Sequence, residues 1–275
     1  AEMGEPELGL RLATSLWLYW QTRGKVAEGR RWLGRFVDDA SIAPDLCAAG
    51  LTVASLLAWM QLDLDAAEAM LAKAVPLWRT IGNIHGIGRA LLFTGFVAWR
   101  RGDGAQMIAA CEEALSFFRE GNDLAGLPLC LIVLAVADHR LSADERALAR
   151  LTEAAQLAEL GGFAWGGAAA RFYQGEVHAQ RGELDAASSA YQTCLTTSWR
   201  LGDPWTTGAG IGGLATIAAM RGAAKTAARL FGAADALCAS AEAVLPVMDR
   251  GSYARIVAAA SGAMGETDFM RAYHA

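Results

Sequence analysis

The run "GAGIGG", Gly208–Gly213, matches the glycine pattern with which a strand–turn–helix unit binds the pyrophosphate of a dinucleotide. That chemistry needs a strand before the glycines, and the preceding segment is the loop-like "RLGDPWTT". The phosphate loop of ATPases is missing as well, because Gly24-Lys25 is followed by Val26 and lacks the upstream glycine. We therefore predict that Gly208–Gly213 lies in a helix whose small residues allow close packing.

The remaining reactive residue types show no catalytic spacing. His85, His139, His178 and His274 include no pair three to five residues apart, which a helical metal site would need. The nucleophile elbow Gly-x-Ser-x-Gly and the motif His-Glu-x-x-His do not occur. The sequence therefore predicts a protein that is not an enzyme and that carries no metal and no cofactor.

Composition limits the surroundings and partners of the chain. Its 275 residues carry a net charge of −5, whereas nucleic-acid-binding domains usually present a basic stripe. The five cysteines form no Cys-x-x-Cys, which is typical of a reducing cytoplasm. The longest apolar run, Leu124–Ala137, is too short to span a bilayer. We expect a cytoplasmic protein with no direct nucleic-acid or membrane partner, and the start at Ala1 suggests a piece of a longer chain.

An internal repeat organises the whole sequence. Small residues recur at steps of 38, 40, 40, 40 and 40, at Gly29, Ala67, Met107, Ala147, Ala187 and Ala227. Four residues later stands a mostly larger side chain, and three residues after that mostly a small one. This small–large–small pattern marks one face of an α-helix that packs closely on another helix.

Turn residues divide each repeat into two helices. Glycine occupies four of the six positions where a left-handed helix cap is expected, at Gly24, Leu62, Gly102, Ser142, Gly182 and Gly222. Aromatic–Arg–Gly segments such as "LWRTIGN" and "SWRLGD" end the second helices, and their aromatic residues are expected to pack under the next repeat. The prediction is an all-α superhelix in one domain, 1–275, with hairpins at about 8–40, 46–82, 86–121, 126–161, 166–202 and 206–240 and a cap at 249–275.

These helix–turn–helix units and their anchors resemble the tetratricopeptide repeat, with a period of 40 rather than the usual 34 residues. The start, "LGLRLATSLWLYWQTRGKVAEGRRWLGRF", and the tail, "AARLFGAADALCASAEAVLP" with "GETDFMRAYHA", resemble the repeat regions of LuxR-type and STAND ATPase transcription regulators. The resemblance implies a tetratricopeptide-like solenoid that binds an inducer or a partner protein. It further implies attached ATPase and DNA-binding domains outside this chain.

In such hairpins the first helix lines the concave side, so the candidate site is a groove. Counting along these helices gives an aromatic and apolar middle with charged residues around it, and His139 as a hydrogen-bonding or pH-sensitive contact. A contiguous apolar patch of this kind favours recognition, but a tight superhelix or the final helices would turn the same rings into core. The candidate residues are Arg11, Thr14, Trp59, Arg89, Phe96, Trp99, Arg100, His139, Phe172 and Glu176.

The function that follows is binding of a protein, a peptide or a small-molecule inducer in this groove. We expect the sensor or scaffold region of a bacterial transcription regulator of the LuxR or STAND type. A freestanding scaffold for two partner proteins is the first alternative. An enzyme built on a helical toroid is the second, and it would require clustered polar residues such as His139 and Glu176 at the groove floor.

Overall fold

The computed structural model describes residues 6–37, 39, 41–244, 247 and 249–275. Positions 1–5, 38, 40, 245–246 and 248 lie outside this description, and so do the corresponding parts of the predicted domain, first hairpin and tail segment. Within the described residues every regular element is a helix, and none is long and apolar enough to cross a membrane. The predicted all-α superhelix of consecutive hairpins is confirmed.

The helices pair in chain order. In the first hairpin the leading helix breaks at Leu16 into α1 (Pro6–Ser15) and α2 (Trp17–Thr22), which precede α3 (Val26–Gly34). The next pairs are α4 (Pro44–Met60) with α5 (Leu64–Ile81) and α6 (Ile84–Arg101) with α7 (Gly104–Glu120). They are followed by α8 (Gly126–Arg140) with α9 (Asp144–Leu160) and α10 (Ala164–Gln180) with α11 (Leu184–Leu201). The sixth pair is α12 (Pro204–Met220) with α13 (Ala224–Ser240), and α14 (Arg250–Met264) and α15 (Glu266–Tyr273) follow it.

The turns between these helices repeat every twenty residues. A residue with positive φ ends one helix, and an aspartate or asparagine often follows it as the N-cap of the next, as at Gly102 and Asp103. The left-handed backbone lets the chain reverse, and the capping oxygen satisfies free N–H groups of the new helix. The positive-φ positions of this series are Leu62, Gly82, Gly102, Asn122, Ser142, Gly162, Gly182, Gly202, Gly222 and Glu242.

The predicted anchors hold the hairpins together. Ala67, Met107, Ala147, Ala187 and Ala227 have no exposed surface, as their small–large–small positions require. Where the first helix of a hairpin lies close to the anchor face of the second helix, any side chain on the first helix at that point would collide with that face. A Cβ added to Gly175, for example, would lie 2.5 Å from the ring of Tyr191. Each hairpin therefore buries its apolar face against its neighbours, as in other solenoids.

The aromatic residues that end the second helices behave differently from one another. Trp78 and Phe118 are buried against the start of the next hairpin, as the sequence predicts. The same prediction is wrong for Trp199, whose side chain is 71% exposed. Two repeats of 40 residues after Phe118, the equivalent position is Ser198. This serine is buried and accepts a hydrogen bond from Thr207 Oγ1 at 3.2 Å. The tryptophan stands one residue too late to face the core.

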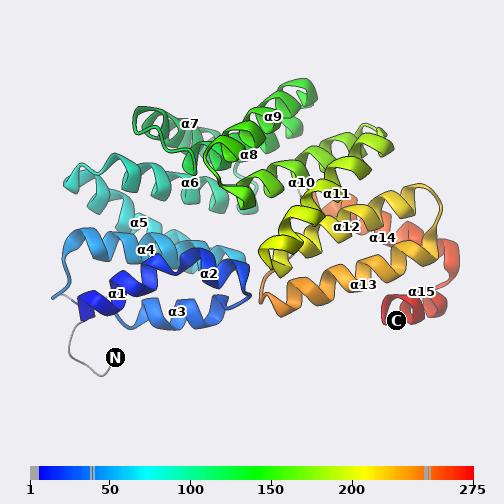
Figure 1. Ribbon diagram of the computed structural model, residues 1–275, viewed down its shortest axis with the longest axis horizontal. Helices are drawn as coiled ribbons and strands as arrows, with labels where there is room; N and C mark the ends of the chain where they lie inside the picture. Colours follow the sequence, from blue (N-terminus) through cyan, green and yellow to red (C-terminus); the bar gives the residue numbers. More distant parts are fainter. Residues whose placement is uncertain (1–5, 38, 40, 245–246, 248) are drawn as a thin grey trace.

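The superhelix curves until its two ends meet (Figure 1). The helices follow an arc from α1 over α7–α9 to α12 and α13. There α12 contacts α2, and the end of α13 meets the turn between α2 and α3. There Glu242 Oε2 accepts a hydrogen bond from the backbone N–H of Ala27 at 2.8 Å. A Cβ added to Gly24 would lie 2.7 Å from the carbonyl oxygen of Ser240, so the backbones are in close contact. We call this junction of the first and sixth hairpins the seam.

The last two helices cover the end of the array. Both α14 and α15 pack on α13, and α14 also contacts α12. Their core is a separate apolar cluster that includes Phe231 and Phe269, with the ring of Tyr253 edge-on to Phe231 at 5.4 Å between centroids. The two helices bury the outer face that the sixth hairpin would otherwise expose, which is the role of a capping repeat.

Candidate functional site

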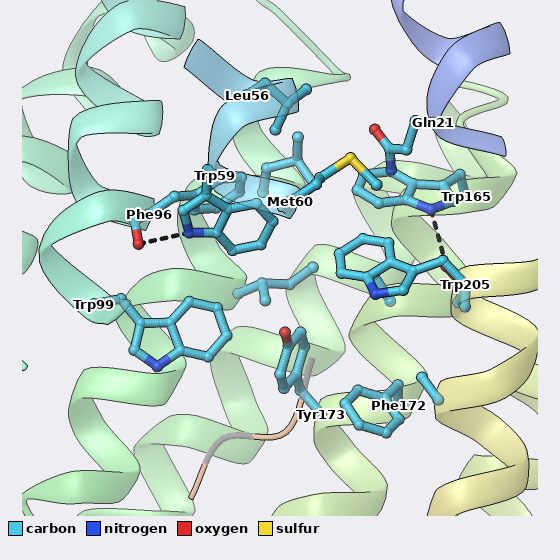
Figure 2. A pocket seen from close by; sticks show the side chains of 15 residues that line it. Gln21, Leu56, Trp59, Met60, Phe96, Trp99, Trp165, Phe172, Tyr173 and Trp205 are labelled. Carbon is cyan, nitrogen blue, oxygen red and sulfur yellow. Dashed lines mark hydrogen bonds between the residues drawn. The ribbon is translucent and has the colours of Figure 1, made fainter. Parts of the chain in front are cut away.

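Closure of the arc encloses a cavity of about 40 Å³ at its centre, which we call the chamber (Figure 2). Every hairpin contributes to its wall, through α2, α4, α6, α8, α10 and α12. These are the first helices of the six hairpins, the ones that sequence reasoning placed on the concave side. Seven of the fifteen lining residues are aromatic: Trp59, Phe96, Trp99, Trp165, Phe172, Tyr173 and Trp205.

The aromatic wall is held by ring contacts and by hydrogen bonds from the indole N–H groups. Trp59 stacks on Phe96 with 4.9 Å between ring centroids and donates its Nε1–H to the carbonyl oxygen of Phe96 at 2.9 Å. Trp165 Nε1 donates to Thr206 Oγ1 at 3.0 Å, and Trp205 Nε1 donates to the carbonyl oxygen of Val244 at 2.8 Å. A buried tryptophan that satisfies its N–H in this way has a fixed ring orientation.

One contact in the chamber joins hairpins that are far apart in the sequence. The ring of Trp205, from the sixth hairpin, meets the ring of Trp59, from the second, edge to face with 6.0 Å between centroids. Because Trp205 also holds Val244, the wall of the chamber is connected directly to the segment that leads toward the C-terminal cap.

Gln21, on α2, is the polar exception in this wall. Its side chain is 1% exposed, and neither its Nε2 nor its Oε1 has a hydrogen-bond partner among the described residues. In Figure 2 it lies on the same side of the chamber as Trp165 and Trp205, opposite Trp59 and Trp99. An amide buried without partners is unfavourable, so this group calls for an explanation.

Arg100 lies behind the aromatic wall. Its guanidinium stands over the rings of Trp59 and Trp99, 5.2 and 5.5 Å from their centroids. Burial lowers the pKa of Arg100 to about 10. Its Nε has no hydrogen-bond partner, and no carboxylate in the described part of the chain forms an ion pair with it. The indole faces stabilise the cation in place of an anion.

Two further cavities continue from the chamber toward the N-terminal side. A narrow one of about 30 Å³ shares Leu56 and Leu129 with it. This narrow cavity in turn shares Trp17, Val53 and Arg89 with a wider, more open one of about 370 Å³. The shared lining residues make the three cavities neighbours.

The ten predicted site residues fall into separate places. Trp59, Phe96, Trp99 and Phe172 all line the chamber, and Arg100 lies behind it. The other predicted residues lie elsewhere. Thr14 and Arg89 line the wide outer cavity, Glu176 lines a different cavity beside Tyr191 and Tyr253, and Arg11 is exposed on α1.

The expected open groove is wrong for the four rings, whose exposures are 2 to 7%. The reason is the seam: the arc closes and fills its own concave side, which was the alternative that the sequence left open. The expected inner-face contact of His139 is not observed either. Its Nδ1 lies 2.7 Å from Asp144 Oδ1, at the start of α9, and its Nε2 lies 2.8 Å from Gln180 Oε1, at the end of α10, so neighbouring helices supply its partners.

The glycine run of α12 has the packing role that the sequence predicts. Gly208–Gly213 lies inside this helix, where a Cβ on Gly210 would lie 3.2 Å from Leu195 and one on Gly213 would lie 2.4 Å from Tyr191. Among the described residues no group of three histidine, cysteine or acidic side chains is arranged to hold a metal ion.

No protein-family model matches the sequence, and a comparison with curated protein sequences likewise finds no match. Solved structures do match. The structure of a Rap protein complexed with competence and sporulation factor superposes with a TM-score of 0.66 at 10% identity, covering 96% of this chain and 89% of that one. BtubC (BKLC) from P. vanneervenii gives a TM-score of 0.54 at 15% identity, covering 90% and 96%.

The chain has a tetratricopeptide-like helical repeat fold. At these identities the likeness establishes the architecture alone, as function depends on the site. The site residues of this tetratricopeptide-like chain that sequence reasoning missed are Trp165, Tyr173 and Trp205. Trp165 and Trp205 each stand second in the first helix of their hairpin, 40 residues apart, and this spacing was the available signal.

Proposed function

We propose that this chain is a non-catalytic binding module that holds a peptide, a protein segment or a small-molecule inducer inside its closed superhelix. The observation that carries the proposal is the shared wall of the chamber. Because all six hairpins contribute side chains to it, an occupant contacts every repeat at once. Buried aromatic side chains also supply the strongest anchors at binding sites.

Binding would be coupled to the shape of the array through the contact between its second and sixth hairpins. An occupant larger than about 40 Å³ has to separate rings of the wall. Trp59, in the second hairpin, meets Trp205, in the sixth, and Trp205 also bonds Val244. A ligand that prefers separated rings therefore shifts the population toward a more open superhelix. Domains attached to either end would experience this change.

The proposed biological setting is the sensor region of a cytoplasmic LuxR-type or STAND ATPase transcription regulator. Its support is the resemblance of the first hairpin and of the tail to such regulators. The net charge of −5 fits a region that leaves DNA contact to another domain. The Rap structure is a complex with competence and sporulation factor, so this architecture does accommodate partners.

The parent reading frame separates the regulator from a freestanding scaffold. A phosphate loop encoded upstream and a helix-turn-helix module encoded downstream are expected for the regulator. A reading frame with neither would contradict that setting, while leaving the binding module itself in place.

The binding role is tested by filling the chamber. Ala169 lines it, and Ala169→Leu places three further carbon atoms there. The matched control is Ala239→Leu on the exposed face of α13. Native chain and both variants are purified without denaturation, and small molecules and peptides released on unfolding are identified by mass spectrometry. We expect a compound present in the native chain and in Ala239→Leu but lost from Ala169→Leu. Equal recovery from all three would contradict an occupant in the chamber.

A further inference from the structure

The buried amide of Gln21 indicates what kind of molecule the chamber takes. The side chain is 1% exposed, and both its donor and its acceptor lack partners among the described residues. The neighbouring wall offers mostly ring carbons and aliphatic groups, and the indole N–H groups of Trp59, Trp165 and Trp205 are already committed to Phe96, Thr206 and Val244. Neither the Tyr173 hydroxyl nor the Trp99 indole forms a hydrogen bond with Gln21. Nothing in the wall therefore satisfies the amide.

A carboxamide presents one N–H donor beside one C=O acceptor in a single plane. The group that satisfies both at once is a second amide, which offers the reverse pair along its own edge. A carboxylate or an ammonium group would satisfy only one of the two. It would also place a charge among side chains of which none is charged, because the guanidinium of Arg100 stands over the Trp59 and Trp99 rings and does not line the chamber; such burial is strongly unfavourable.

The rest of the wall selects a flat apolar body. Trp59, Trp165 and Trp205 surround the chamber, and aromatic faces favour stacked or edge-on rings. Resting on the binding module proposed above, we infer that the chamber takes an uncharged planar amide attached to an aromatic or similarly flat apolar group, with Gln21 pairing to the amide. A free aromatic amide and an aromatic residue within a peptide share this chemistry.

The free volume sets a condition on binding. About 40 Å³ holds one or two water molecules, whereas a cavity that binds benzene measures roughly 150 Å³. The occupant must therefore displace part of the wall. The Trp59–Trp205 contact joins the second and sixth hairpins, so separating the two rings moves side chains of different hairpins apart.

A series of three probes of equal size tests the assignment. Benzamide carries donor and acceptor, acetophenone carries the acceptor only, and α-methylstyrene carries neither. Binding to the full chain is measured by isothermal titration calorimetry and by tryptophan fluorescence. N-acetylphenylalanine N-methylamide represents an aromatic residue within a peptide.

Gln21→Met is the matched variant, because it keeps the length of the side chain and removes both polar groups. The native chain is expected to bind benzamide about tenfold more tightly than acetophenone or α-methylstyrene. In Gln21→Met this preference should disappear or reverse. Thermal unfolding verifies that the variant folds. Its melting temperature should be equal to or above that of the native chain, because the variant no longer buries an amide without hydrogen-bond partners. Tighter binding of the peptide mimic than of benzamide would identify the source as a peptide.

The outcomes separate this inference from the proposed function. Equal binding of benzamide and α-methylstyrene by the native chain, or a preference for benzamide that survives in Gln21→Met, would overturn the amide assignment and leave a ligand chamber. Failure of every probe to bind either protein would contradict the chamber as a site altogether. In that case water molecules are the partners of Gln21.

Discussion

The carboxylate of Glu242 accepts a hydrogen bond from the backbone N–H of Ala27 at 2.8 Å, although 215 residues separate the two. Ala27 lies in the first turn of α3, whose own N-cap residue, Lys25, provides no side-chain cap. The last turn of the sixth hairpin thus caps the first hairpin. The bond supplies an acceptor to a free N–H group and a negative charge to the positive end of a helix.

Removing this cap is expected to weaken the seam. Glu242→Ala should lower the free energy of unfolding by about 1 kcal/mol, which corresponds to roughly 2–4 °C in melting temperature. Glu242→Gln keeps an acceptor and loses the charge, so its loss should be smaller. Differential scanning calorimetry measures both. An unchanged melting temperature in Glu242→Ala would mean that the seam does not form in solution.

Two turn residues carry backbone strain that glycine would relieve. Leu62 and Ser142 have φ values of 61° and 57° at positions where other turns of the series use glycine. The left-handed conformation costs about 1–2 kcal/mol for residues with a Cβ. Substitution by glycine removes this cost, but the greater entropy of glycine in the unfolded chain offsets part of the gain in stability. Leu62→Gly and Ser142→Gly should each stabilise the protein by about 0.5–1 kcal/mol. Gly102→Ala, at an equivalent turn with φ of 79°, should destabilise it; the opposite signs would refute the assigned turn conformations.

The stability should depend on pH through Asp203. This carboxylate is fully buried, where Oδ1 caps α12 by accepting from the N–H groups of Trp205 and Thr206. Burial raises the pKa of Asp203 above its ordinary value of 3.8. Between the unfolded and the folded pKa the folded state binds more protons, so the stability contributed by Asp203 falls as pH rises from about 4.

Asp203→Asn keeps the capping oxygen and removes the charge. The stability of the native chain relative to Asp203→Asn should therefore decrease between pH 4 and pH 7, and at pH 7 the variant should be at least as stable. Asp103→Asn, at the exposed cap of α7, is the matched control, and chemical denaturation at several pH values supplies the measurement. A pH trend identical in the two variants would show that burial of Asp203 is not responsible.

The chamber rings are expected to contribute to stability as core residues do. Trp99 is 4% exposed, meets Tyr173 at 5.6 Å between centroids and supports the cation of Arg100. Trp99→Ala should cost about 3–5 kcal/mol, or roughly 10 °C in melting temperature, while Trp99→Phe should lose much less. A native-like melting temperature for Trp99→Ala would mean that the ring lies in an open groove after all.

The hairpins could be predicted from the sequence because their signals are local. A glycine followed by an aspartate, as at Gly102 and Asp103, ends one helix and caps the next. Small residues such as Ala67 and Ala147 mark the helix face that packs against another helix. The inner position of Trp59 and Trp99 followed from the same counting, since a first helix has one concave side.

The seam and the full chamber could not be predicted in this way. Closure depends on small rotations between neighbouring repeats that add up over six hairpins, and no single residue encodes their sum. Gln21 stands next to last in α2, and glutamine is ordinarily a surface residue, so nothing in the sequence pattern singles it out as a buried wall residue. The cap that Glu242 provides to Ala27 has no counterpart in a periodic pattern.

Pulsed electron paramagnetic resonance across the seam tests the closed superhelix most directly. Spin labels are placed at Lys25→Cys and Ser240→Cys, both exposed, in a chain whose half-buried Cys47 is replaced by serine. The account predicts one narrow, short distance between the labels, because the backbones of the two turns are in contact there. A broad distribution centred near the length of an open solenoid would contradict it.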